Sequence, residues 1–266
     1  MLTYPDIDPI IFQLGPLAVR WYGLMYVLGF LAAFFLVRYQ FRRYPHPGLA
    51  EHFDNLNLIL IVSLILGARI GYVALYNLPY YWQNPLEILA IWQGGMSFHG
   101  GLLGALGGGW LFCHYRGLNF LRTADAYVVP APIGLIFGRL GNFINAELYG
   151  RVSDVPWAMV FPGGGPLPRH PSQLYQSFFE GLILFVIMWY ALKLYWQRQW
   201  PAGRLVVVFL VGYGVFRFAV EFFRQPDANL SLLFGVFTLG QVLSLLMIVT
   251  GILLWQVLTV RQRKRQ

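Results

Sequence analysis

Charge and cysteine are both scarce in this chain. Charged residues make up 11% of its 266 positions, and Cys113 is its one cysteine. An ordinary soluble domain carries roughly 25% charged residues, so this composition cannot build the surface of a cytosolic enzyme. A single cysteine excludes a disulfide scaffold, and an aromatic content of 18% excludes a disordered chain. The composition that remains is that of a polytopic membrane protein.

Three further absences narrow the function. The five histidines are dispersed, without the spacing of metal ligands, so we expect no metal. No convincing internal repeat is present, which weakens the case for an inverted-repeat transporter. The first sixteen residues contain no Lys or Arg, so the charged region of a cleavable signal peptide is missing. We therefore expect the first apolar segment to stay in the mature protein.

Long apolar runs are what the chain has in abundance. Runs near the roughly 20 residues that cross a bilayer favour helices over the short alternating strands of a barrel. The sequence predicts an all-α polytopic membrane protein, a single integral-membrane domain over residues 1–266 with seven transmembrane helices. The expected spans are 17–37, 56–76, 96–115, 126–145, 174–194, 205–223 and 239–257.

The Lys and Arg residues between these spans predict the orientation. With the N-terminus periplasmic and the C-terminus cytoplasmic, twelve cationic residues lie inside and three outside, as the positive-inside rule requires. The net charge of +8 then reflects topology and anionic lipid headgroups, not nucleic acid. The inner set is Arg38, Arg42, Arg43, Arg116, Arg122, Lys193, Arg198, Arg204, Arg261, Arg263, Lys264 and Arg265, and the outer set is Arg151, Arg169 and Arg224.

The remaining four arginines fall inside the predicted spans, where an ionisable group costs about 2.5–3.5 kcal/mol. They are Arg20, Arg69, Arg139 and Arg217. On the predicted topology all four share the outer half of the bilayer, and His99 lies near that depth. A guanidinium group presents a planar fork of donors suited to phosphate or carboxylate. The shared depth therefore predicts an anion site toward the periplasmic side.

Helical spacing groups some of these residues further. Tyr213, Arg217, Glu221 and Arg224 are separated by four, four and three positions and share one helical face. Arg139 and Asn142 also share a face, and glycines flanking Arg139 permit close approach. Two helices thus offer guanidinium groups at one depth.

Structural roles compete with function at several of these positions. Arg20 is close enough to a span end to snorkel to the headgroups, Arg69 suits a structural ion pair, and Glu221 suits a partner that neutralises Arg217 or Arg224. Tyr213 could belong to the interfacial tyrosine belt. Gly100, Gly104 and Gly108 have the spacing of tight helix packing. His99 beside them is either an ordinary hydrogen-bonded histidine or a general base. Cys113 suits a small apolar filler.

These patterns leave two classes of function open. One is an enzyme acting on a phospholipid, whose phosphate sits near the predicted depth. The other is a transporter or channel for an anion or lipid. The polar groups cluster at one depth and the inner halves of the spans are nearly free of charge, so the sequence shows no obvious path across the membrane. That distribution favours the enzyme.

Several segments resemble the bacterial phosphatidylglycerol–prolipoprotein diacylglyceryl transferases, in the same order and over essentially the whole chain. They are Arg20 to Tyr26 (RWYGLMY), Gly94 to Gly104 (GGMSFHGGLLG), Gly138 to Glu147 (GRLGNFINAE) with Gly150, Arg169 to Tyr175 (RHPSQLY), Tyr213 to Arg217 (YGVFR) and Glu221 to Asp227 (EFFRQPD). The loop between Gly150 and Arg169 looks shorter than in some members.

The resemblance implies transfer of a diacylglyceryl group from phosphatidylglycerol to the lipobox cysteine of a prolipoprotein signal peptide. A thioether forms and glycerol phosphate leaves, at the periplasmic side of the bacterial inner membrane. The implied partners are these two substrates and membrane lipid, with no nucleic acid and no cofactor. Another headgroup or acyl transferase is an alternative within the enzyme class.

The resemblance also implies roles for particular residues. His99 matches the position of a base, and we assign Arg139 and Arg217 to the phosphate, because fixed cations should stabilise the leaving group of this reaction. Four further positions match residues associated with the site and are expected to orient the headgroup or support the arginines: Tyr22, Asn142, Glu147 and Tyr213. Gly150 matches a functionally sensitive glycine, which we interpret as a requirement of backbone geometry.

Overall fold

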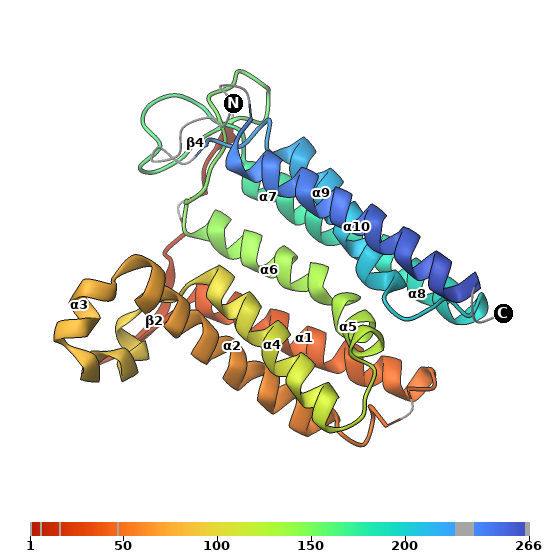
Figure 1. Ribbon diagram of the computed structural model, residues 1–266. Helices are drawn as coiled ribbons and strands as arrows, with labels where there is room; N and C mark the ends of the chain where they lie inside the picture. The colour runs from red at the N-terminus through yellow and green to blue at the C-terminus, as the bar shows by residue number, and fades with distance from the viewer. Residues whose placement is uncertain (1, 6, 16, 47, 227–236, 264–266) are drawn as a thin grey trace. The chain divides into compact units, whose positions relative to one another are not determined.

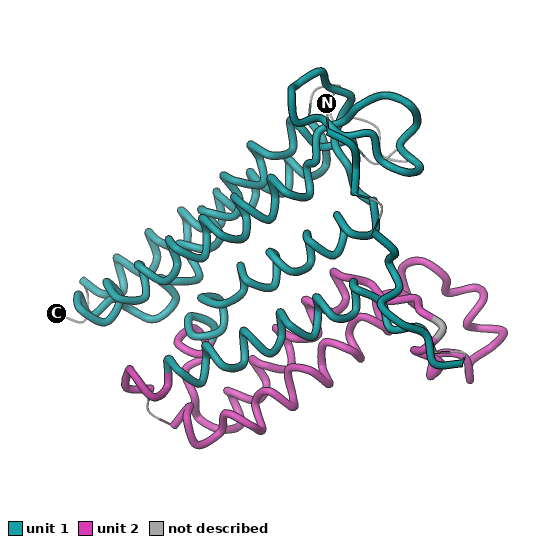
Figure 2. The backbone as a smooth tube through the Cα atoms, turned by 180° about the vertical axis from the view of Figure 1, so that it is seen from behind, with its two compact units in different colours: residues 1–40, 124–266 teal, residues 41–123 magenta. Residues whose placement is uncertain are grey.

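A computed structural model describes residues 2–5, 7–15, 17–46, 48–226 and 237–263. Asp227, the last residue of the segment Glu221 to Asp227, lies outside the described residues. So do Lys264 and Arg265 of the predicted inner cationic set. The described chain is mostly helical (Figure 1). It divides into two compact units, one of residues 1–40 and 124–266 and one of residues 41–123 (Figure 2). The expectation of a single integral-membrane domain stays a prediction.

The chain begins with strands, and this corrects the first predicted span. Strand β2 (Ile10–Leu14) pairs antiparallel with β3 (Leu17–Arg20), and helix α1 (Trp21–Arg43) follows. The helix therefore starts at Trp21 and not at residue 17, and Arg20 lies in a strand. The reason is a turn at Gly15, whose φ of +58° suits glycine. That turn lets residues 17–20 satisfy their backbone groups on β2 before the helix begins.

The fourth predicted span is also not one continuous helix. Helix α5 (Phe120–Val128) and helix α6 (Ala131–Ile144) are bent by 43° relative to each other. Pro130 lies in the break, and Pro132 is the second residue of α6. Proline lacks a backbone N–H and disfavours helical geometry in the residue before it, so two prolines this close interrupt the expected helix over 126–145.

A helical layer follows in the first unit. Helix α7 (Ser172–Gln176), the π-helical segment η3 (Ser177–Ile183) and α8 (Leu184–Gln197) form one stretch, followed by α9 (Arg204–Val220) and α10 (Leu239–Arg263). Helices α8, α9 and α10 run side by side (Figure 1). Gly181 in η3 is in close contact with Ile136 of α6, leaving no room for a side chain. Segment η3 is thus pressed against the helix that carries Arg139.

The long loop between α6 and α7 is held by backbone pairing. Its strand β4 (Met159–Val160) pairs in parallel with β1 (Leu2–Thr3) at the start of the chain. Isolated bridges join Gly150 to Arg224 and Val152 to Arg169. The loop is therefore tied to the beginning of the chain and to the end of α9.

The second unit is built on two helices in close contact. They are α2 (Phe53–Tyr76) and α4 (Phe98–Tyr115), separated by α3 (Leu78–Gln83), η1 (Pro85–Leu89) and η2 (Ile91–Gln93). A Cβ on Gly71 would lie 2.8 Å from the Cα of Gly100, and one on Gly104 would lie 2.9 Å from the Cα of Gly67. The predicted packing role of the spaced glycines is confirmed.

Four of the described helical stretches are long and apolar enough to cross a membrane: α1, α2, residues Ser172–Gln197 and α10. The bent pair of α5 and α6 would make a fifth. Helix α4 is rich in glycine and is not apolar enough, and α9, with 17 residues, is not long enough to be counted with them. A multi-pass membrane protein is supported, whereas the count of seven spans and their orientation stay predictions.

Candidate active site

Arg217 is the centre of a buried ionic cluster in the first unit. Its Nη2 lies 2.6 Å from Oε2 of Glu221, one turn further along α9. Its Nη1 lies 3.5 Å from Oε1 of Glu180 and donates to Oε1 of Gln176 at 3.2 Å. Both carboxylates are almost completely buried. The predicted partnership of Glu221 with Arg217 is therefore present.

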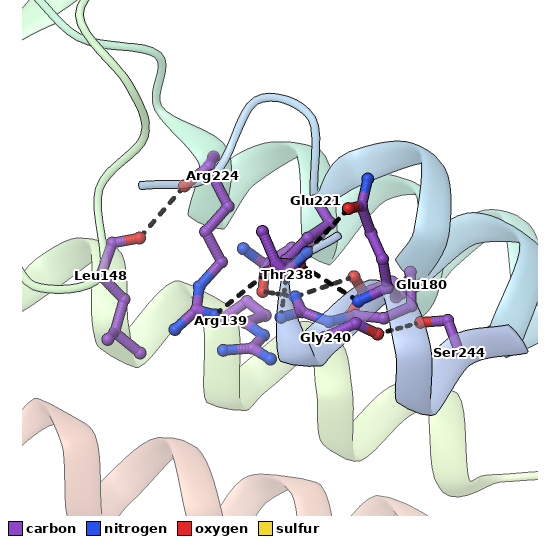
Figure 3. Close-up of polar contacts among 12 residues, drawn as sticks. Arg139, Leu148, Glu180, Glu221, Arg224, Thr238, Gly240 and Ser244 are labelled. Carbon is purple, nitrogen blue, oxygen red and sulfur yellow. Dashed lines mark hydrogen bonds and ion pairs between the residues drawn. The ribbon is translucent and has the colours of Figure 1, made fainter. Parts of the chain in front are cut away.

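Glu221 is held from several directions. The hydroxyl of Thr238 donates to its Oε1 at 3.0 Å, and Arg224 Nη1 lies 3.6 Å from the same oxygen (Figure 3). A Cβ on Gly240 would lie 2.7 Å from this carboxylate, so only glycine fits there. Thr238 and Gln241 exchange hydrogen bonds as a capping box at the start of α10. Glu221 is thus locked to the N-terminus of α10.

Glu180 is a site residue that the sequence interpretation missed. Its side chain is fully buried in η3, and the positive charges of Arg217 and Arg139 both act on it. π-Helical turns occur frequently at functional sites. The signal that could have found it is a lone carboxylate inside the apolar run of the fifth predicted span, an ionisable residue of the kind that marks function.

Helix α6 brings a second group of predicted residues together. Arg139 Nη1 donates to Oδ1 of Asn142 at 3.4 Å, and Asn142 Nδ2 donates to Oε1 of Glu147 at 2.8 Å. The shared face of Arg139 and Asn142 is confirmed. Both are on the last turns of α6, and Glu147 follows the helix end. Asn142 is therefore held in position by hydrogen bonds to both Arg139 and Glu147.

Glu147 sits in a strained turn that other residues brace. Ala146 and Leu148 on either side of it adopt left-handed backbone angles, with φ of +54° and +56°. Such angles in non-glycine residues cost about 1–3 kcal/mol and cluster at functional sites. The Gln173 amide donates to the Glu147 carbonyl at 2.6 Å, and the Ser172 hydroxyl donates to the Leu148 carbonyl at 3.1 Å. The conformation of Glu147 is therefore fixed by α7.

Tyr22 lies against α6 at the start of α1. A Cβ on Gly141 would lie 2.9 Å from its ring, so this glycine makes room for the aromatic side chain. The Tyr22 hydroxyl lies 3.1 Å from that of Tyr26, and the charge of Glu147 acts on it. The structure thus brings Tyr22 to the helix that carries Arg139 and Asn142.

Gly150 connects the loop to the end of α9. Its N–H donates to the His170 carbonyl at 2.8 Å, and a Cβ there would lie 2.5 Å from the Phe223 carbonyl oxygen. The interpretation of Gly150 as a backbone requirement agrees with this crowding. The His170 ring lies 3.0 Å from the Tyr175 hydroxyl, and burial lowers the pKa of His170 against an opposing effect of Asp154. His170 is therefore neutral near pH 7 and serves the packing of this loop.

Arg69 and His99 lie in the second unit. Arg69 is buried and donates to the backbone carbonyls of Glu87, Ile88 and Gly94 at 2.6–2.8 Å. A structural role is thus supported, although its partners are carbonyls and not the carboxylate of an ion pair. His99 is exposed in the first turn of α4, where Ser97 accepts a hydrogen bond from Gly100 N–H at 3.2 Å as the N-cap.

The guanidinium groups of the first-unit cluster suit an anion. Arg139, Arg217 and Arg224 bring three positive charges, while Glu180, Glu221 and, through Asn142, Glu147 bring three negative charges. Tyr213 lies within electrostatic reach of Arg217, Arg139 and Glu180. A guanidinium group presents a planar fork of donors that binds phosphate or carboxylate. No group of three or more metal-ligating side chains is found in the part of the chain that the structure describes.

Comparison with known proteins decides the family. A family model described as prolipoprotein diacylglyceryl transferase matches residues 9–257. The chain belongs to this family. The match covers both units and all the site residues named above.

Curated relatives match this chain over nearly their whole length. A protein of Desulfotalea psychrophila is 54% identical over 265 residues, 99% of this chain and 97% of its own. A protein of Geobacter sulfurreducens is 51% identical over 94% of this chain and 95% of its own. Both are named phosphatidylglycerol–prolipoprotein diacylglyceryl transferase. The predicted resemblance to this family is confirmed.

Proposed function

We propose that this protein transfers the diacylglyceryl group of phosphatidylglycerol to the lipobox cysteine thiol of a prolipoprotein. The product is a thioether, and glycerol phosphate leaves, in the first step of lipoprotein maturation. Family membership over residues 9–257 carries the proposal. The guanidinium groups of the first-unit cluster support it, because the lipid substrate presents a phosphodiester anion.

The reaction sets three chemical requirements. The nucleophile comes from the substrate, so Cys113, which is buried, has no part in the chemistry. A free thiol has a pKa near 8.5, so a base must favour the thiolate, and we assign this to His99. The thiolate attacks the glycerol carbon next to the phosphate ester, and the carbon–oxygen bond to phosphate breaks. The leaving phosphate gains charge, which fixed cations stabilise.

We assign the phosphate to Arg139 and Arg217. They approach from α6 and α9, two helices of the same unit, and both act on Glu180 between them. Asn142 and Glu147 orient Arg139 through the contacts described above, while Tyr22 and Tyr213 border the headgroup. Gly150 keeps the loop against the end of α9. No metal or organic cofactor has a role in this scheme.

The placement in the membrane is part of the proposal. Seven spans with the N-terminus periplasmic would put α4 and α9 across the bilayer as the third and sixth spans. The site would then face the periplasmic side of the bacterial inner membrane, where a translocated signal peptide presents its cysteine. The distribution of Lys and Arg along the sequence supports this arrangement.

The test of function uses purified protein, phosphatidylglycerol in liposomes and a signal peptide with a lipobox cysteine. Mass spectrometry of the peptide should detect a diacylglyceryl adduct, with an equimolar amount of released glycerol phosphate. A peptide in which serine replaces the cysteine is the matched control. Folded protein that forms no adduct with several anionic lipids would refute the transferase and favour a transporter, which leaves its phospholipid chemically unchanged.

A further inference from the structure

Two carboxylates flank Arg217, and the structure holds them in different ways. Glu221 pairs with Nη2 at 2.6 Å and is fixed by the Thr238 hydroxyl and by the crowded backbone of Gly240. It cannot move without disturbing the cap of α10. Glu221 is therefore a permanent anchor for one side of the guanidinium group.

Glu180 has none of these restraints. It lies 3.5 Å from Nη1, and neither of its carboxylate oxygens has a hydrogen bond of ordinary geometry among the described residues. Nη1 is shared instead with the neutral amide of Gln176 at 3.2 Å. Nη1 of Arg217 is thus paired loosely with Glu180, and no hydrogen bond from another described side chain holds the Glu180 carboxylate in place.

A loosely paired buried carboxylate calls for an explanation. Burial of a charge is expensive, and poor pairing does not repay the lost hydration. A buried polar group that is only partly satisfied in a native protein needs a specific explanation, and a functional role is one of them. The charges acting on Glu180 come from Arg217 and Arg139, the two residues assigned to the phosphate. Its surroundings therefore connect it to anion binding.

We propose that Glu180 is a displaceable counter-ion of Arg217, a positioning residue that competes with the phosphate for Nη1. The inference rests on the proposed function. Before the lipid binds, Glu180 offsets the repulsion between guanidinium groups. The phosphate then takes Nη1 from Glu180 while Glu221 keeps Nη2 in position. When glycerol phosphate has formed, Glu180 regains Nη1 and so favours release of the product.

The deciding variant is Glu180→Gln, which keeps the shape of the side chain and removes the competing charge. Since the phosphate then no longer competes with a carboxylate for Nη1, we expect a roughly tenfold lower KM for phosphatidylglycerol. The inhibition constant of glycerol phosphate should fall by about the same factor, and kcat should fall because the product leaves slowly. A residue that only supports the fold would not tighten the binding of either anion.

Glu221→Gln is the matched control, because it neutralises the other carboxylate of the same arginine. It should weaken anion binding and lower the melting temperature, since it disturbs the anchor and the cap of α10. Equal tightening in both variants would overturn the distinction between anchor and displaceable counter-ion.

Glu180→Asp covers the case in which Glu180→Gln does not fold. It retains the buried charge but withdraws the carboxylate from Nη1. The KM for phosphatidylglycerol and the inhibition constant of glycerol phosphate should therefore both fall, by a smaller factor than in Glu180→Gln. If the wild type is active and the folded Glu180 variants have an unchanged or higher KM and inhibition constant, the inference is refuted and the proposed function is not. A wild type that forms no adduct would refute the proposed function instead.

Discussion

Arg139 and Arg217 carry the same group and have different surroundings. Arg217 is enclosed by two carboxylates and an amide, whereas the hydrogen bond recorded for Arg139 is a long one to Asn142. A guanidinium group with weaker protein contacts has more capacity for a substrate anion. Arg139 is accordingly the residue at which phosphate binding should be most sensitive.

Arg139→Ala should lower kcat at least ~10²-fold, by loss of a fixed cation at the developing charge. Arg139→Lys should recover part of the activity, because it keeps the charge and loses the planar fork. Adduct formation on the lipobox peptide measures both, and the amount of protein in the membrane controls for folding. Wild-type rates in Arg139→Ala would exclude it from the phosphate site.

His99→Gln should reduce the rate at least ~10²-fold if His99 is the general base. The control is His114→Gln, an exposed histidine at the other end of the same helix, which should leave activity unchanged. A peptide supplied as a preformed thiolate at high pH should narrow the difference between His99→Gln and wild type. A rate only a few-fold lower than wild type would contradict the role of His99 as general base and indicate a supporting role.

His46 makes stability depend on pH. It is buried, and burial together with the charge of Arg122 lowers the pKa of His46 to about 4. Its unfolded pKa is about 6.5, so the unfolded chain binds the proton first as pH falls. Stability should therefore be lost below pH 6.5, by about 2 kcal/mol between pH 7 and pH 5. Melting temperatures across this range should fall less steeply for His46→Gln, and parallel slopes would contradict the prediction.

At the scale of elements, the start of α9 depends on a residue from another helix. Asp125 of α5 is buried and accepts hydrogen bonds from the N–H groups of Gly203 and Val206 at 2.6 and 3.0 Å. The first N–H groups of a helix have no partner within it, and a negative charge there is favourable. Asp125 thus caps α9 from a distance of 78 residues along the chain.

Asp125→Asn should destabilise the protein by about 1–3 kcal/mol. The amide keeps one acceptor oxygen but turns an NH₂ group toward the other N–H donor. Thermal unfolding in detergent measures the loss. Asp54→Asn, at an exposed position in the first turn of α2, is the control and should unfold within a degree or two of wild type.

Elements differ in how far their sequence predicts them. The apolar runs predicted α2 and α10 well, because a continuous apolar helix satisfies its own backbone and needs no partner in lipid. Residues 17–19 are also apolar but belong to β3, since the partner strand β2 is available through the turn at Gly15. Periodicity also cannot show the π-helical turn at Glu180, which arises where η3 packs on α6.

At the scale of the whole molecule, two reporters test the predicted topology. A reporter fused after Gln266, which lies outside the described residues, should read cytoplasmic. A reporter inserted at the exposed Gly163 of the loop between α6 and α7 should read periplasmic. An even number of spans between Gly163 and Gln266 would place both reporters on one side of the membrane and remove the shared depth of the arginines.

The sequence by itself determined the class of protein and the family, and it predicted a set of site residues. Scarce charge excludes a soluble surface whatever the fold, and the motifs of this family are long enough to be specific. Only the tertiary structure decided what each arginine contacts. Arg69 is satisfied by carbonyls, Arg217 by carboxylates, and Arg20 lies in a strand. The cost of a buried charge is a property of its residue type, whereas its compensation depends on groups that folding brings from distant parts of the chain.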